Sequence, residues 1–216
     1  MLTLLEEVAL LTIDPRTGGL RGDQLYSIPY ALAGAALFDL ALAGRIDTDT
    51  EAITVVGTGE TGQRVQDELL AELVKQGGPL DVRRWVEQTF LLHKDLEERA
   101  LKQLVDRGLV RLETSRRLWV IEIQRFPMLD GRPYQLVRDR LCDAILGDAV
   151  PPTRDIMLVS LASACGLLGV VLTPEQMAAR RDRIDALSSV ETIARNVSNA
   201  IASLYSDMAR GLTGAM

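Results

Sequence analysis

The side chains that could catalyse a reaction or bind a metal are few in this sequence of 216 residues. It contains one histidine, His93, and two cysteines, Cys142 and Cys165. These are too few for a four-ligand zinc site, and no Gly-x-Ser-x-Gly nucleophile motif accompanies the histidine. We therefore expect no enzymatic activity, no metal site and no cofactor. His93 should be structural, and the cysteines, both in predicted helices, should pack as small apolar side chains.

A glycine pattern over residues 57–62, Gly-Thr-Gly-Glu-Thr-Gly, matches the dinucleotide-binding fingerprint. It follows a β-branched segment at 53–56, predicted as a strand, and precedes a predicted helix over 63–75. A dinucleotide fold would need a second parallel strand and an acidic residue about 20 residues further on. Gly77-Gly78-Pro79 and the start of another helix stand there instead. The pattern is therefore interpreted as a turn and a helix N-terminus.

The charge of the chain argues against a nucleic acid partner. It has 24 basic and 30 acidic residues, a formal net charge of −6, whereas nucleic-acid-binding proteins normally carry a basic face. A predicted helix from Leu96 to Gly108 and a following hairpin resemble the recognition helix and wing of a winged-helix protein. Between residues 94 and 107, however, four basic residues are matched by four acidic ones. A winged-helix DNA-binding regulator is therefore kept only as an alternative.

Hydrophobic periodicity predicts a mainly α fold, a single helical domain around a central apolar helix bundle with one protruding β-hairpin. The domain should span residues 1–210, followed by a short C-terminal tail, 211–216. The hairpin is predicted over 109–123, with its turn at Thr114-Ser115-Arg116. The further predicted helices are 4–14, 28–42, one that carries Trp85 and is capped by Asp81, 134–146, 156–172, 174–187 and 190–208.

Residues 156–172 contain no charged side chain, and their 17 residues are close to the lower limit for a helix that spans a membrane. Two serines and two glycines make the segment less apolar than a typical span. It is therefore predicted to be a buried central helix, and the Ala-rich segment 28–42 a second one whose small residues allow close packing. Because the N-terminus lacks the basic region of a signal peptide, we expect a cytoplasmic protein.

Several segments follow one another in an order and spacing typical of one protein family. They are LTLLEEVALL at 2–11, LALAGRI at 40–46, TG at 61–62 with DELL at 67–70, WVE at 85–87, and LVDRGLV at 104–110 with its hairpin. In this succession the sequence resembles the Golgi phosphoprotein 3 family over nearly its whole length. The resemblance implies a mostly helical domain, a hairpin used in self-association and no enzymatic activity. It also implies a peripheral membrane protein that recognises phosphatidylinositol 4-phosphate through a shallow basic pocket beside an apolar loop, and that in eukaryotes is a Golgi trafficking adaptor.

The resemblance also implies where the headgroup would bind. Eukaryotic members form the pocket from a tryptophan before the second helix, an arginine in that helix and two arginines on the helix before the hairpin. The matching positions here hold Gln24, Ala33, Lys94 and Glu97. Only one of them is basic, so an anionic headgroup should bind much more weakly than to forked guanidinium groups. Three basic residues that lie near these positions in sequence could compensate in part: Arg21, Arg84 and Arg99.

The leading hypothesis is a non-enzymatic protein on the inner face of a membrane, bound to an anionic phospholipid headgroup or to the cytoplasmic segment of a membrane protein. Membrane or oligomer contact is expected at the hairpin, where the indole suits a half-wet surface. The hairpin residues concerned are Arg116, Arg117, Leu118 and Trp119. The alternative is a protein-interaction module that forms oligomers and has lost lipid binding. The Ala, Arg and Gly content indicates a high-GC bacterial source, to which a Golgi role would not apply.

Overall fold

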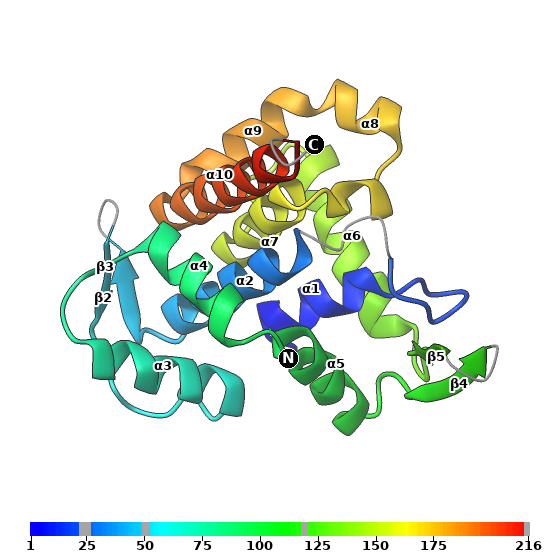
Figure 1. The fold of residues 1–216 in the computed structure, drawn as a ribbon. Coiled ribbons are helices and arrows are strands. Elements are labelled where there is room, and N and C mark those ends of the chain that lie inside the picture. Colours follow the sequence, from blue (N-terminus) through cyan, green and yellow to red (C-terminus); the bar gives the residue numbers. More distant parts are fainter. Residues whose placement is uncertain (22–26, 49–51, 118–120, 214–216) are drawn as a thin grey trace.

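The computed structural model describes residues 1–21, 27–48, 52–117 and 121–213, which form the mainly α fold that the sequence predicts. The strands are β1 (Ile46–Thr48), β2 (Ala52–Val55), β3 (Leu80–Asp81), β4 (Glu113–Arg117) and β5 (Ile121–Arg125). The β4–β5 hairpin protrudes at the edge of the helical body, and α1, α2 and α7 lie in its middle (Figure 1). The helices are α1 (Leu4–Thr12), α2 (Ile28–Leu42), α3 (Arg64–Gln76), α4 (Val82–Leu92), α5 (Leu96–Asp106), α6 (Arg132–Leu146), α7 (Thr153–Ala164), a 3₁₀ helix (Leu167–Val170), α8 (Pro174–Ala179), α9 (Arg181–Val190) and α10 (Thr192–Thr213).

The core is built around α1 and α2. α1 begins with a capping box: the Glu6 amide donates to the Thr3 hydroxyl at 3.1 Å, and the Thr3 amide donates to the Glu6 carboxylate at 2.8 Å. All nine residues of α1 are buried, and α2 is buried over nearly all of its length. Helices that are buried all round belong in the interior of a bundle, so α1 and α2 form the centre on which the others pack.

Small residues let α2 approach its neighbours closely, as the sequence predicts. A Cβ added at Gly34 would lie 2.6 Å from Val197 Cγ1 on α10 and 2.9 Å from Leu161 Cδ2 on α7. Both distances are well below van der Waals contact, so a larger residue would push the three helices apart. Gly34 therefore fixes the spacing of α2, α7 and α10.

A buried carboxylate joins three of the helices. Asp39 on α2 accepts hydrogen bonds from the first two amides of α1, Leu4 N at 2.8 Å and Leu5 N at 3.1 Å, and from Gln66 Nε2 on α3 at 3.1 Å. The two amides are among those that a helix leaves unpaired at its N-terminus. Burial raises the pKa of Asp39 to about 6, although these hydrogen bonds favour the ionised form.

The strands differ from the prediction in number and register. The predicted strand at 53–56 is β2, but it is the centre of an antiparallel sheet in the order β1-β2-β3 whose outer strands were not predicted. The turn predicted at residues 114–116 was wrong, because these residues lie inside β4 and pair with residues 122–124 of β5. The hairpin strands are polar and lie away from the core, so hydrophobic alternation does not mark their ends.

Two predicted helices are each divided. The segment 156–172 does not form one central helix, because α7 ends at Ala164 and Gly166 adopts the left-handed region at φ 75°, before the 3₁₀ helix. A left-handed residue ends an α-helix. The segment 174–187 is divided between α8 and α9, which meet at Arg180. Within the described residues, no helix is both long and apolar enough to cross a membrane.

Candidate functional site

The structure places two of the predicted headgroup residues at the junction of α4 and α5. Lys94 is exposed in the short connection between the helices, and Glu97 is half-buried in the first turn of α5. Burial raises the pKa of the Glu97 carboxyl. Ala33 is fully buried inside α2, and Gln24 lies outside the described residues.

Two exposed leucines precede Lys94 at this junction. Leu91 and Leu92 end α4 with 54% and 70% of their surface exposed. The helix is held to the core behind them, because Trp85 is buried as predicted and the Phe90 ring stacks on Tyr30 of α2 at a centroid distance of 4.5 Å. The α4–α5 junction, Leu91 to Glu97, therefore presents two exposed leucines beside a single lysine, on a helix that packs against the core.

The three arginines expected to compensate do not gather at the junction. Arg84 lies in the first turn of α4, about 12 Å along the helix axis from its C-terminal end. Arg99 is 21% exposed and forms an ion pair with Glu68 of α3. Arg21 contributes to lowering the pKa of Asp14, after the hydrogen bonds that this carboxylate accepts from the Arg16 and Thr17 amides. Arg84 is thus at the opposite end of α4, Arg99 is paired with Glu68, and Arg21 lies near Asp14.

The residues that could have carried enzymatic chemistry have structural partners. His93 follows the last turn of α4, and its Nε2 lies 2.9 Å from Glu72 Oε2 on α3. Cys142 lies in α6, and Cys165 caps α7 rather than lying within it, where burial raises its pKa to about 12. A thiol with so high a pKa is not an activated nucleophile.

Neither of the two nucleotide-binding alternatives finds support in the geometry. The glycine pattern at 57–62 follows an antiparallel strand and encloses Arg45, whose Nη2 donates to Glu60 O at 3.1 Å. On α5, which would be the recognition helix of a winged-helix protein, Lys102 pairs with Asp106 at 2.8 Å. The other α5 bases, Arg99 and the capping Arg107, also pair with carboxylates.

The predicted contact residues of the hairpin lie only partly in the described chain. Arg116 and Arg117 belong to β4, where they pair with Glu122 and Ile121 of β5. Leu118 and Trp119 lie outside the described residues.

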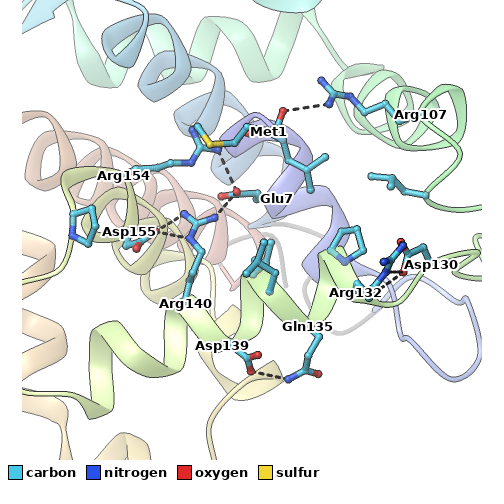
Figure 2. Close-up of a pocket in the computed structure, with 16 residues that line it drawn as sticks. Met1, Glu7, Arg107, Asp130, Arg132, Gln135, Asp139, Arg140, Arg154 and Asp155 are labelled. Atoms are coloured by element: carbon cyan, nitrogen blue, oxygen red, sulfur yellow. Dashed lines mark hydrogen bonds and ion pairs between the residues drawn. The ribbon is translucent and has the colours of Figure 1, made fainter.

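A pocket of about 1080 Å³ opens between α1, α6, the start of α7 and the end of α5 (Figure 2). Sequence reasoning missed it, because its walls come from four separate segments between Met1 and Asp155. One signal was available: Glu6 and Glu7 stand side by side in the apolar run of α1, and both are buried. Buried carboxylates need partners, so their presence indicates basic residues brought in from elsewhere.

Four charged side chains form the base of this pocket, and we call them the Glu7 cluster: Glu7, Arg140, Arg154 and Asp155. Glu7 is 2% exposed, and its Oε1 lies 2.6 Å from Arg140 Nη1 and 3.2 Å from Arg154 Nη2. Arg140 also forms an ion pair with Asp155 (Figure 2). The cluster joins α1, α6 and α7 through two positive and two negative charges.

The order of elements and the succession of motifs find a counterpart among known proteins. A sequence model of Golgi phosphoprotein 3 (GPP34) matches residues 4–204. The chain belongs to the Golgi phosphoprotein 3 family. This match confirms the resemblance read from the motifs and covers the chain from α1 to α10.

A curated protein is also similar to this chain. Vacuolar protein sorting-associated protein 74 of Eremothecium gossypii is 30% identical over 166 residues, which are 67% of this chain and 49% of the relative. The match therefore spans about half the length of the relative.

Proposed function

We propose that this protein is a non-enzymatic peripheral membrane protein that binds an anionic phospholipid headgroup at the α4–α5 junction. The observation that carries the proposal is the match to the Golgi phosphoprotein 3 family over residues 4–204. Phosphatidylinositol 4-phosphate is the proposed headgroup, and the inner face of the membrane is the proposed location.

The chemistry of the α4–α5 junction supports this proposal. Leu91 and Leu92 are exposed and adjacent, and aliphatic side chains of this kind enter the boundary between headgroups and acyl chains. Lys94 follows two residues later and would reach a phosphate, with an attraction of about 1 kcal/mol for one lysine at an anionic surface. Because Glu97 stands where an arginine would add a second cation, we propose weak binding.

Liposome co-sedimentation tests the proposal directly. Vesicles of phosphatidylcholine alone would be compared with vesicles that contain phosphatidylserine or phosphatidylinositol 4-phosphate. We expect binding to anionic vesicles that weakens about fivefold in Lys94→Ala. Absence of binding to every anionic vesicle would remove the lipid part of the proposal.

Glu97→Arg provides a sharper test than loss of a lysine. It reverses the charge at the half-buried position beside Lys94, and a guanidinium can bind phosphate through two hydrogen bonds. We expect binding to phosphatidylinositol 4-phosphate vesicles to rise by about tenfold. Glu98→Arg is the matched control, because Glu98 is exposed on the same turn of α5 and the net charge changes equally. An equal gain in both variants would point to general attraction and not to a site.

Self-association through the hairpin is a second candidate, favoured by its strand edges. Within the described residues β4 pairs with β5 alone, so the outer edge of each strand has no ladder partner there. Such edges readily pair with another chain. Light scattering should show a mass that rises with protein concentration and falls when Leu118 and Trp119 are replaced by Ser. A monomer at all concentrations would count against it.

A further inference from the structure

We propose that protons regulate the binding of anionic membranes at the α4–α5 junction, through His93 and Glu97. The inference rests on the proposed function, since it concerns the same surface. His93 ends α4, and Glu97 stands in the first turn of α5, with Lys94 between them. When the pH falls, a histidine becomes positively charged and a carboxylate becomes neutral. Both changes make the junction less negative, so acidic conditions should strengthen binding.

His93 faces a carboxylate on a neighbouring helix. Its Nε2 lies 2.9 Å from Glu72 Oε2 on α3, and 13% of its side chain is exposed. A neutral imidazole leaves the charge of Glu72 uncompensated, whereas a protonated one forms an ion pair with it. His93 is adjacent to Lys94 in the chain, well within the Debye length of about 10 Å at 0.1 M ionic strength. Its protonation therefore acts on a headgroup bound at Lys94 without direct contact.

Glu97 places a negative charge beside Lys94 as long as its carboxyl group is ionised. The side chain is half-buried in the first turn of α5. Burial raises the pKa of this carboxyl, so Glu97 takes up its proton at a higher pH than an exposed glutamate does. The neutral form no longer repels a phosphate, so the attraction of Lys94 for a headgroup is not opposed by this group.

The other acidic groups around the junction differ from Glu97 in their surroundings. On the elements that contact α4 and α5 they are Glu6 and Glu7 of α1, Asp39 of α2 and Glu68 of α3. Glu6, Glu7 and Glu68 are paired with arginines, and Glu87, Asp95 and Glu98 of the junction's own helices are exposed. Carboxylates that are exposed or paired with arginine are ionised above pH 5. Burial raises the pKa of Asp39 to about 6, so the test has to separate its proton from those of the junction.

Liposome co-sedimentation at pH 7.5 and 5.5 tests the proposal, with vesicles that contain phosphatidylserine or phosphatidylinositol 4-phosphate. The readout is the ratio of a variant's affinity to that of the wild type on the same vesicles, because titration of the headgroup or of Asp39 affects both proteins equally. The protein must carry no histidine tag, since His93 is its one histidine. In His93→Gln/Glu97→Gln both side chains are neutral over this pH range. We expect a ratio of about five at pH 7.5 and of about one or less at pH 5.5, since one charge changes the affinity about fivefold.

The single variants separate the two contributions. Glu97→Gln should bind about fivefold more tightly than the wild type at pH 7.5, and this ratio should fall toward about one at pH 5.5, as Glu97 of the wild type takes up its proton. His93→Gln should match the wild type at pH 7.5 and bind about fivefold more weakly at pH 5.5. Each variant gives its own ratio, so the failure of one to fold does not prevent the test.

Glu98→Gln is the matched control for pH dependence, because Glu98 is exposed on the same turn of α5 and the variant loses the same charge. Its ratio to the wild type should be the same at both pH values. Ratios that do not change with pH in the His93 and Glu97 variants, or a change of equal size in Glu98→Gln, would overturn the regulation by protons while membrane binding stands. Absence of binding at both pH values would overturn the proposed function as well, so the two failures are distinguishable.

Discussion

At the residue scale, Asp39 and Gln66 form a pair that suits either protonation state of the carboxyl group. Gln66 Nε2 now donates to Asp39 Oδ2, while Gln66 Oε1 is buried with no partner among the described residues. Rotation of the amide by half a turn would exchange these two atoms. A protonated Asp39 could then donate to Gln66 Oε1, so the proton can be taken up without breaking the contact between α2 and α3.

This pair predicts a pH dependence of stability that belongs to Asp39. Its pKa rises from 3.8 to about 6 on folding, so the folded state binds the proton more tightly than the unfolded state. The associated stability is fully present below pH 4 and is lost as the pH rises through 6, a change of about 3 kcal/mol. Urea unfolding of the wild type and Asp39→Asn at several pH values should show this difference between the two curves.

Asp14→Asn is the control for sign. Asp14 is half-buried, and amide hydrogen bonds lower its pKa, so the stability it contributes is present above its unfolded pKa and is lost as the pH falls. The two differences between wild type and variant should therefore run in opposite directions with pH. The same direction for both would contradict the assignment to Asp39.

The contacts of these residues show which part of the structure the sequence can predict. The Thr3–Glu6 capping box and the Asp81 cap, which accepts from Arg84 N at 2.8 Å, join residues three apart and follow from local patterns. Asp39 caps α1 from 35 positions away. Such a contact depends on tertiary packing, and a single acidic residue in an apolar helix does not reveal its partner.

At the element scale, Gly166 decides where α7 ends. An added Cβ would meet no atom within 4 Å there, so only the left-handed backbone at φ 75° disfavours a side chain. We expect Gly166→Ala to lower the free energy of unfolding by about 1–2 kcal/mol. Urea denaturation would measure it.

Gly169→Ala is the control at the same segment. Gly169 lies in the 3₁₀ helix, has no positive φ and has equal room for a Cβ. Its substitution should change stability by less than about 0.5 kcal/mol. Equal losses in both variants would mean that the backbone conformation at Gly166 is not the cause.

Gly166 also explains why the prediction of one continuous helix over 156–172 was wrong. Composition gives no reason to divide 156–172, and a glycine inside an apolar run is compatible with a helix. The prediction of 28–42 matches α2, whose two ends carry local signals, Pro29 at the N-terminus and Gly44 beyond the C-terminus. Boundaries marked by local chemistry were found, and those set by backbone handedness at one residue were not.

At the scale of the whole molecule, the Glu7 cluster fastens the first helix to α6 and α7. Removing Arg140 would leave Asp155 without this partner and Glu7 with Arg154 alone. We expect Arg140→Ala to cost about 3 kcal/mol, since breaking a buried ion pair leaves an uncompensated charge. Thermal and urea unfolding would both register it.

Arg64→Ala is the matched control, because the Arg64 side chain is 89% exposed and pairs with Glu68 on the surface of α3. Exposed pairs contribute about 0–1 kcal/mol, and its loss should be at the lower end of that range. Comparable losses for the two arginines would show that the cluster is no more than a surface network.

The candidate sites differ in how far the sequence could reach them. The α4–α5 junction is contiguous in sequence, so Lys94 and Glu97 could be singled out by matching to a family. The pocket above the Glu7 cluster is assembled from residues far apart, such as Leu2 and Leu136. Its recognition required the fold.

Because α1 lies at the centre of the fold, its apolar side chains cannot all be buried as soon as they are synthesised. α1 is synthesised before the other helices described here, yet it packs against α5, α6 and α7, and the last of these ends about 150 residues later. At a synthesis rate of about 5–20 residues per second, the interval between the synthesis of α1 and the end of α7 is roughly 8–30 s. During that interval the nascent chain exposes a short apolar helix that a chaperone can hold. The core around α1 can therefore be completed only after α7 has been synthesised.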